Sequence, residues 1–383
     1  MEYRVMGRCG HSVSVFGIGT MRLPLRIQKD GSTNYGSIDE QKAIDMIRQG
    51  IDQGVNYIDT AYTYHQGNSE RVLGKALKRG YRERVNIATK LPVWKVKSAD
   101  DFDRILNEQL EKLQVSSIDF YLLHALSKKP WQRLKEMGVL DFLNRARQDG
   151  RVKHVGFSFH DQLPVFKEIV DSYDWDMCQI QLNLLDEEFQ AGVAGMRYAA
   201  DKGLGVVVME PLRGGALAQK VPADIQAQWS QYRVNRSPAE WAFRWLANFP
   251  EVSVILSGIN NLEQLNENVS IFSKTSPHML TTEESDLINQ VQMLYREKIK
   301  VGCTGCQYCM PCPSHVDIPE IFRLYNQVFL YDDLASSQTA YQELIKQKSD
   351  ASQCVACGQC ESLCPQNLSI IEKLAEADDV LRT

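Results

Sequence analysis

The sequence has no long hydrophobic run, and this absence argues against a membrane-spanning helix. No apolar stretch approaches the roughly 18 residues that such a helix needs. The start of the chain, Met1-Glu2-Tyr3-Arg4-Val5, also lacks a secretory pattern. We therefore expect a cytoplasmic protein without a membrane partner.

Positive charge is not in excess either. The 43 Lys and Arg residues are outnumbered by 48 Asp and Glu residues, and the formal net charge is −5 at pH 7. Binding to nucleic acid needs clustered Lys and Arg side chains that neutralise phosphates, so we expect no nucleic acid partner. With 383 residues, 44% of them hydrophobic, the chain is long enough for one large and one small domain, each with a core.

Cysteine, by contrast, is concentrated near the C-terminus. Most of the 10 cysteines fall in two runs, each followed by proline. The first run is Cys303, Cys306, Cys309 and Cys312, and the second is Cys354, Cys357, Cys360 and Cys364. A cysteine at every third position lets one turning segment direct several thiolates at one point. The C-x2-C-x2-C-x3-C-P spacing of the second run is the ligand pattern of bacterial ferredoxins.

Structural zinc and disulfides are the alternative uses of such cysteines. Zinc prefers two C-x2-C pairs separated by a longer span, and disulfides suit small secreted domains. We therefore expect two [4Fe–4S] clusters and a reducing compartment. The two remaining cysteines, Cys9 and Cys178, are expected to be packing residues.

In ferredoxins with two clusters, the last cysteine of each run ligates the cluster of the other run. By this rule Cys312 would join the cluster of the second run, and Cys364 would join the cluster of the first. The first run is one residue shorter before its last cysteine, so this pairing is a hypothesis.

Before residue 300, short apolar runs rich in β-branched residues alternate with stretches of helical periodicity. Eight such units fit a (β/α)8 barrel better than an open sheet. The expected strands are Val15–Thr20, Asn56–Thr60, Val85–Lys90, Ile118–His124, Val152–Ser158, Met177–Gln181, Gly205–Glu210 and Val252–Ser257. The expected helices include Ile38–Gln53, Ser69–Arg79, Asp100–Lys112, Leu134–Gln148, Phe189–Lys202 and Pro238–Asn248.

Segments at both ends of this region have other patterns. Tyr3–Val13 is expected to form a hairpin before the first strand. After the last strand, helical patterns cover Thr281–Lys300, Ile318–Tyr325 and Ala340–Lys348. We expect a barrel domain over residues 1–280 and a small, mainly helical, ferredoxin-like domain over residues 281–383.

Ionisable residues stand where the expected strands end, and active sites of (β/α)8 barrels lie at the carboxyl ends of the strands. Asp59 closes the second expected strand, shortly before Tyr64, Lys90 closes the third, and His124 closes the fourth. These four side chains should meet on one rim of the barrel.

Their chemistry fits the reduction of a carbonyl group. A nearby ammonium lowers the pKa of a tyrosine, which is about 10 in water. Lys90 can supply this charge, Asp59 can hold Lys90, and His124 can orient a carbonyl oxygen. Tyr64 would then deliver a proton to oxygen while hydride reaches carbon. The residues alone leave a second interpretation open, in which Asp59 and Lys90 form an ordinary ion pair and the other two have no catalytic part.

Several motifs decide between the two. The chain begins with Tyr3-Arg4-Val5-Met6-Gly7, then Gly10, Val13-Ser14 and Gly17-Ile18-Gly19-Thr20. It continues with Asn56-Tyr57-Ile58-Asp59-Thr60-Ala61-Tyr62-Thr63-Tyr64, followed by Gly67-Asn68-Ser69-Glu70. Over residues 1 to about 275 the sequence resembles the aldo-keto reductases. The resemblance implies that Asp59, Tyr64, Lys90 and His124 form a catalytic tetrad with Tyr64 as proton donor.

The same resemblance implies NADP(H), or sometimes NAD(H), lying extended across the barrel mouth. Ser158 and Gln179 would bind the nicotinamide amide. The full set of implied cofactor contacts is Thr20, Met21, Ser158, Gln179, Met209, Pro211, Leu212, Gly258, Asn260, Gln264, Glu267 and Asn268. No G-x-G-x-x-G fingerprint follows a strand, in agreement with a binding mode outside the Rossmann fold.

The sequence departs from the family pattern at some of these positions. Phe159 and His160 follow Ser158, where many relatives carry Asn, and His160 is a candidate replacement for that amide. Met209 stands where many relatives have an aromatic residue. Gly258 and Gln264 stand where basic residues often bind the 2′-phosphate, and Arg213 is a candidate substitute. The resulting preference for NADP(H) over NAD(H) is slight.

We therefore expect an NAD(P)-dependent oxidoreductase that interconverts a small carbonyl compound and an alcohol and carries two [4Fe–4S] clusters. The clusters would be structural or would pass electrons to a separate redox partner, and we favour this interpretation over one in which they join the redox chemistry of the barrel. The alternative function is an iron–sulfur electron-transfer protein whose barrel serves as a docking or cofactor-binding scaffold.

Overall fold

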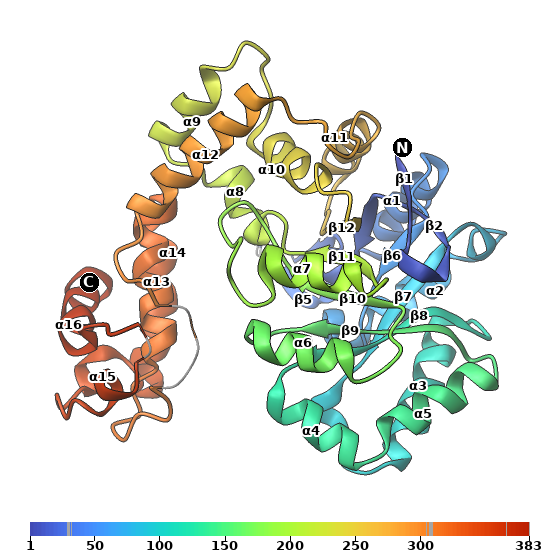
Figure 1. The fold of residues 1–383 in the computed structure, drawn as a ribbon, viewed down its shortest axis with the longest axis horizontal. Coiled ribbons are helices and arrows are strands. Elements are labelled where there is room, and N and C mark those ends of the chain that lie inside the picture. Colours follow the sequence, from blue (N-terminus) through green and yellow to red (C-terminus); the bar gives the residue numbers. More distant parts are fainter. Residues whose placement is uncertain (29–30, 32, 304, 306–308, 365, 383) are drawn as a thin grey trace. The chain divides into compact units, whose positions relative to one another are not determined.

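Alternating strands and helices build the first part of the chain, as the alternating apolar and amphipathic patterns predict. The computed structural model describes residues 1–28, 31, 33–303, 305, 309–364 and 366–382. Eight described parallel strands close into a barrel in the order β10-β11-β12-β3-β6-β7-β8-β9 (Figure 1). They are β3 (Phe16–Gly19), β6 (Tyr57–Asp59), β7 (Asn86–Leu91), β8 (Ile118–Leu126), β9 (Val152–Phe159), β10 (Met177–Gln181), β11 (Gly205–Met209) and β12 (Val252–Ser257). The predicted (β/α)8 barrel is confirmed.

Helices separate successive strands of the barrel. They are α1 (Glu40–Asp52), α2 (Ser69–Ala76), α3 (Asp100–Leu113), α4 (Lys128–Glu136), α5 (Val139–Gln148), α6 (Leu163–Asp171), α7 (Gly192–Asp201), α8 (Ala216–Gln219), α9 (Ala223–Ser230) and α10 (Pro238–Ala247), with α11 (Leu262–Phe272) after the last strand. The prediction of one helix over Leu134–Gln148 is wrong. Gly138 has a φ of 80°, in the left-handed region that glycine adopts without strain, and it separates α4 from α5.

Two hairpins stand outside the barrel. β1 (Tyr3–Val5) pairs antiparallel with β2 (Ser12–Ser14), which confirms the hairpin expected at the start of the chain. A second hairpin, β4 (Leu25–Ile27) with β5 (Thr33–Ile38), lies between β3 and α1 and was not predicted. Its strands are mostly exposed, so they lack the apolar alternation by which a half-buried strand is recognised.

The barrel interior is closely packed. Tyr57, Phe120, Met177 and Val254 belong to one fully buried cluster in which side chains from different strands meet. A Cβ atom at Gly156 would lie only 2.5 Å from the backbone oxygen of Met177, so glycine is required where β9 meets β10. The centre of the barrel is therefore a packed core, and the site must lie at a rim.

The C-terminal region is helical, as expected. Its helices are α12 (Thr282–Glu297), α13 (Ile318–Tyr331), α14 (Leu334–Gln347), α15 (Gln359–Leu363) and α16 (Ile370–Leu381). A capping box starts α12, because Thr281 and Glu284 each bond to the other's backbone N–H. Apolar side chains of α13, α14 and α16 form one core, against which several cysteines of both runs pack.

The chain divides into two compact units. One comprises Met1–Gly214 and Ala242–Leu280, and the other comprises Gly215–Trp241 and Thr281–Thr383. The boundary at residue 280 expected from the sequence remains a prediction. None of the described helices is long and apolar enough to cross a membrane.

Candidate active site

Asp59 and Lys90 form a buried ion pair at the carboxyl ends of two neighbouring strands, β6 and β7. The Lys90 ammonium donates to both carboxylate oxygens, at 2.7 and 2.6 Å, and to the backbone oxygen of Thr60 at 2.8 Å. Burial acts to lower the pKa of Lys90, but the neighbouring Asp59 and Tyr64 together outweigh it and raise the pKa, so the side chain stays an ammonium.

Tyr64 lies beside this pair. It opens the short helix η3 (Tyr64–Gly67), and the Lys90 Nζ atom lies 5.0 Å from the centroid of its ring. Burial raises the pKa of the Tyr64 phenol, whereas the charge of Lys90 acts to lower it. The phenol therefore keeps its proton near neutral pH, which is the state that a proton donor requires.

His124 closes the group from β8, the next strand of the barrel. Its ring centroid lies 6.1 Å from that of Tyr64 and 5.0 Å from that of Trp94. Burial, followed by the nearby charges of Lys90 and His160, lowers the pKa of His124 to about 2. The imidazole is therefore neutral, and among the residues that the structure describes its buried Nδ1 has no hydrogen-bond partner. The four predicted tetrad residues thus come together on one rim.

The residues predicted to bind the nicotinamide amide lie side by side on adjacent strands. Ser158 of β9 and Gln179 of β10 are partners in the strand register. The Ser158 hydroxyl accepts from the backbone N–H of Ala125 at 2.7 Å and still has its own proton to donate. The buried Oε1 of Gln179 has no partner in the described part of the chain. One donor and one acceptor side by side match a carboxamide, so these residues fit the nicotinamide.

The other predicted cofactor contacts differ in accessibility. Thr20 is fully buried, and its hydroxyl donates to the backbone oxygen of Asp59 and accepts from Ser69. Asn268 is nearly buried and donates to Ser257. The side chains of Thr20 and Asn268 therefore make hydrogen bonds within the buried part of the rim. Met209 and Leu212 are half-buried, Pro211 is buried, and Glu267 is exposed.

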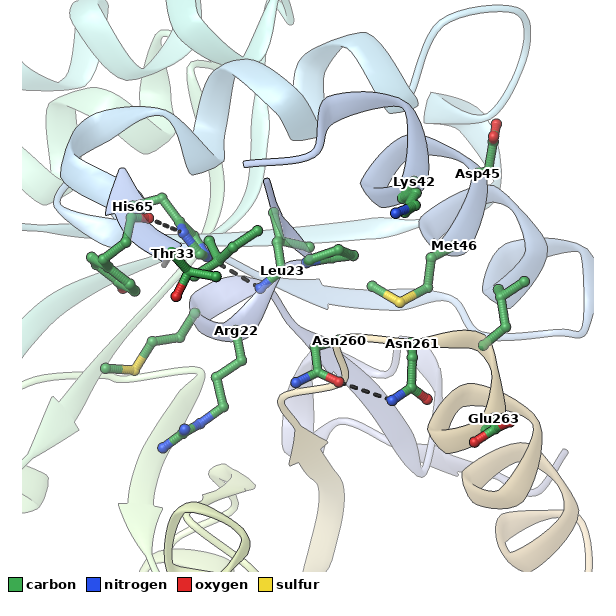
Figure 2. Close-up of a pocket in the computed structure, with 15 residues that line it drawn as sticks. Arg22, Leu23, Thr33, Lys42, Asp45, Met46, His65, Asn260, Asn261 and Glu263 are labelled. Carbon is green, nitrogen blue, oxygen red and sulfur yellow. Dashed lines mark hydrogen bonds between the residues drawn. The ribbon is translucent and has the colours of Figure 1, made fainter. Parts of the chain in front are cut away.

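A cavity of about 1050 Å³ opens on the same rim, where β3 and β12 end (Figure 2). Met21 and Asn260, two predicted cofactor contacts, line it together with Lys42 of α1 and His65 of η3. The backbone N–H of Asn260 donates to Gln264 Oε1 at 3.0 Å. The Gln264 side chain therefore occupies one backbone N–H donor of the loop that the sequence predicts to contact the 2′-phosphate.

Arg22 is a residue of this rim that the sequence reasoning missed. A Cβ atom at Gly258 would lie 3.0 Å from Arg22 Cδ, and one at Gly214 would lie 2.9 Å from Arg22 Nη2, so the side chain covers both glycines. Its signal in the sequence is a basic residue two positions after Thr20. Arg213 is the residue that the sequence suggested as a substitute contact for the 2′-phosphate, and its Nε lies 3.3 Å from Asp186 Oδ2.

The cysteine runs meet at a small cavity in the C-terminal unit, with a volume of about 10 Å³. Its lining cysteines are Cys309, Cys312, Cys354, Cys357 and Cys360. Within the described residues, no three His, Cys, Asp or Glu side chains lie close enough to hold a single metal ion. A cubane is bound differently, by four thiolates on four separate irons around a common cavity, and this donor set suits it. Cys306 lies outside the described residues, and Cys303 and Cys364 pack against the core of this unit.

Comparison with known proteins identifies both parts of the chain. Residues 16–292 match the Aldo/keto reductase family, and residues 302–369 match a 4Fe-4S dicluster domain. An aldo-keto reductase of Bacillus subtilis is 28% identical over 275 residues, covering 69% of this chain and 76% of the relative. The NADH-specific methylglyoxal reductase of Escherichia coli is 26% identical over 308 residues, covering 69% of this chain and 91% of that enzyme.

Solved structures share the barrel. The holo form of an aldo-keto reductase from Bacillus halodurans superposes with a TM-score of 0.63 at 24% identity, covering 76% of this chain and 96% of the other. A thermostable aldo-keto reductase has a TM-score of 0.62 at 23% identity, covering 76% of this chain and 100% of its own. At these identities the likeness establishes the fold.

Proposed function

Because this chain belongs to the aldo/keto reductase family of oxidoreductases and carries a C-terminal 4Fe-4S domain, we propose that it interconverts a small carbonyl compound and an alcohol. The family uses nicotinamide cofactors, which supply the hydride. The observation that carries this proposal is the buried Lys90–Asp59 pair beside Tyr64 and His124 at the ends of three adjacent barrel strands.

Each residue of this group has a distinct part in the proposed reaction. Tyr64 gives its phenolic proton to the carbonyl oxygen as the carbonyl is reduced, and it takes the proton back in the reverse direction. The Lys90 ammonium stabilises the phenolate that this transfer leaves, and Asp59 fixes the ammonium in place. The neutral imidazole of His124 orients the carbonyl oxygen by a hydrogen bond.

The nicotinamide amide would be held by Ser158 and Gln179, and the rest of the dinucleotide would extend past Met209 toward Asn260 and Gln264. We retain a slight preference for NADP(H), which the exposed guanidinium of Arg22 beside Gly258 supports. A relative named as NADH-specific and the Asn260–Gln264 bond favour NAD(H). Direct titration with both cofactors decides between them.

We propose two [4Fe–4S] clusters in the C-terminal domain, with the last cysteine of each run exchanged between them. Cys312 lines the same cavity as Cys354, Cys357 and Cys360, which supports this exchange for the second cluster, although Cys309 of the first run lines it too. Cys303, Cys306, Cys309 and Cys364 would hold the first. Iron–sulfur clusters with this ligand set fit the reducing environment of the cytoplasm.

The clusters are proposed to exchange electrons with a separate redox partner. A cluster passes one electron at a time, whereas hydride transfer moves two electrons together. We therefore expect neither nicotinamide cofactor alone to reduce the clusters. Visible absorbance of the anaerobically purified protein measures this directly, and bleaching by NADPH or NADH alone would contradict the separation of the two redox systems.

The proposed activity is tested with the complete anaerobic protein. Quenching or enhancement of nicotinamide fluorescence reports binding of NADPH and NADH, and loss of absorbance at the reduced nicotinamide band reports turnover. Methylglyoxal, the substrate named for the Escherichia coli relative, is a suitable first carbonyl in a panel of small aldehydes and ketones. Binding without turnover across the panel, in both directions, would count against the proposal.

A further inference from the structure

His65 directly follows Tyr64, and both nitrogens of its buried ring are engaged. Nε2 lies 3.1 Å from the backbone nitrogen of Leu23, which can only donate, and Nδ1 lies 2.6 Å from the backbone oxygen of Tyr35, which can only accept. A neutral imidazole with its proton on Nδ1 satisfies both bonds, which Figure 2 shows. Burial lowers the pKa of His65, in agreement with the neutral ring.

These bonds fasten the β4–β5 hairpin to the segment after Tyr64. The ring of Tyr35 stacks on that of His65 with 4.5 Å between centroids. Asn68 donates to the backbone oxygen of Gly36 at 3.1 Å. A Cβ atom at Gly36 would lie 2.3 Å from Gln66 Oε1, so glycine permits this close approach. The hairpin and η3 therefore contact each other at several consecutive residues.

The backbone after Tyr64 adopts a strained conformation. His65 has a φ of 51° and Gln66 a φ of 56°, and neither is glycine. Two such residues cost on the order of 1–3 kcal/mol each, and they persist only where surrounding contacts hold them. The contacts of the His65 ring with Leu23 and Tyr35 hold this strained backbone in place.

From these contacts we propose that His65 is a positioning residue for Tyr64. Its ring joins the backbone at Leu23 and Tyr35 to the peptide that follows Tyr64, and it thereby keeps the phenol beside Lys90 and His124. We call the two hydrogen bonds of the His65 ring, to Leu23 and Tyr35, the His65 clamp. The catalytic part of this inference rests on the proposed function, whereas the clamp rests on the hydrogen bonds alone.

Two substitutions separate the ring from the backbone strain. His65→Gly relieves the left-handed φ but removes both bonds and the stacking, whereas His65→Asn tolerates the same φ and keeps a short donor and acceptor. His278→Gly is the matched control, because His278 is exposed and has a φ of 55°. Hydrogen exchange of the Leu23 amide reports the clamp, and steady-state kinetics with NAD(P)H and a carbonyl substrate report its effect.

We expect His65→Gly to speed exchange at Leu23 and to lower kcat by about tenfold or more, with the KM for the cofactor changed less than about twofold. The pH profile of kcat should shift, and His65→Asn should restore part of the rate. Unchanged kcat and pH profile in a folded His65→Gly protein, or an equal loss in His278→Gly, would overturn the positioning role. If the wild-type protein turns over no carbonyl compound, the proposed function is wrong instead. The exchange rate of the Leu23 amide in His65→Gly then still tests whether the His65 hydrogen bonds hold the backbone.

Discussion

The ammonium of Lys90 lies within 2.8 Å of both carboxylate oxygens of Asp59 and of one backbone oxygen, and solvent reaches almost none of the pair. Three acceptors match the three donors of an ammonium. Each group is the other's counter-charge, and the burial of both side chains leaves solvent little room to replace a lost partner. The pair links the stability of the barrel to the chemistry of the proposed site.

Replacing Lys90 with Met should destabilise the protein by about 3–5 kcal/mol, because it leaves the Asp59 carboxylate buried without a counter-charge. Urea unfolding of the barrel measures the loss. Lys153→Met is the matched control, since Lys153 also pairs with a buried aspartate, Asp119, which keeps Arg82 at 2.7 Å. This control should cost less than about 1 kcal/mol. Similar losses in the two variants would contradict the dependence of Asp59 on Lys90.

Tyr64→Phe removes the proposed proton donor and leaves the ring in place. We expect NAD(P)H-dependent carbonyl reduction to fall by at least about 100-fold, with cofactor binding and cluster absorbance retained. Tyr35→Phe serves as the control, because it also removes one hydroxyl near the rim but preserves the stacking on His65. Full activity in Tyr64→Phe would rule out Tyr64 as the proton donor.

His124 should make stability depend on pH. Its pKa is about 2 in the folded chain and near 6.5 when unfolded, so only the unfolded chain takes up this proton as pH falls below 6.5. The free energy of unfolding therefore decreases between these values, by at most about 1.4 kcal/mol per pH unit from this group. His124→Gln removes the contribution, and its stability should fall less steeply than that of the wild type between pH 7 and 5. Parallel slopes would show that His124 is not held neutral.

Cysteine substitutions test the exchange of ligands between the two runs. Cys312→Ala and Cys354→Ala should impair the same cluster, whereas Cys364→Ala should impair the cluster served by the first run. Iron content and electron paramagnetic resonance of the reduced protein distinguish the two losses. Cys178→Ala should retain all iron, because Cys178 is buried in β10. Loss of the first-run cluster in Cys312→Ala would contradict the exchange.

Gly74 allows α2 to approach α3 closely. A Cβ atom there would lie 2.5 Å from the backbone oxygen of Leu113, and backbone cannot yield as a flexible side chain does. Gly74→Ala should therefore destabilise the barrel by about 1–3 kcal/mol in thermal or urea unfolding. Gly19→Ala is the control, since its nearest contact would be an ordinary 3.5 Å. Equal stability of the two variants would contradict the predicted steric conflict.

The strand ends were predictable because buried parallel strands are continuous apolar runs, and a lysine or aspartate at such an end stands out. Asp59, Lys90 and His124 could thus be placed on one rim from the sequence. The β4–β5 hairpin could not, because its exposed residues have no apolar periodicity. The contacts of His65 with Leu23 and Tyr35 escaped prediction for the same reason, since they depend on where that hairpin docks.

Other details depend on packing that the sequence does not record. Thr20 matched the pattern of a cofactor contact, yet its hydroxyl is used between Asp59 and Ser69. The break between α4 and α5 lies at a single glycine, Gly138. The apolar periodicity of the sequence continues across this glycine and does not reveal the break. Motifs identify the residue types at a site, whereas the partners of each side chain follow only from the folded arrangement.

The register pairing of Ser158 with Gln179 has an evolutionary consequence. Their separation is set by the spacing of two neighbouring strands, about 4.8 Å, and not by any loop. Loops at the barrel rim can therefore change in length and composition without disturbing this pair. Descendants of such a chain can change their loops, and with them the substrate pocket, while the proposed contacts of this pair with the nicotinamide amide keep their geometry.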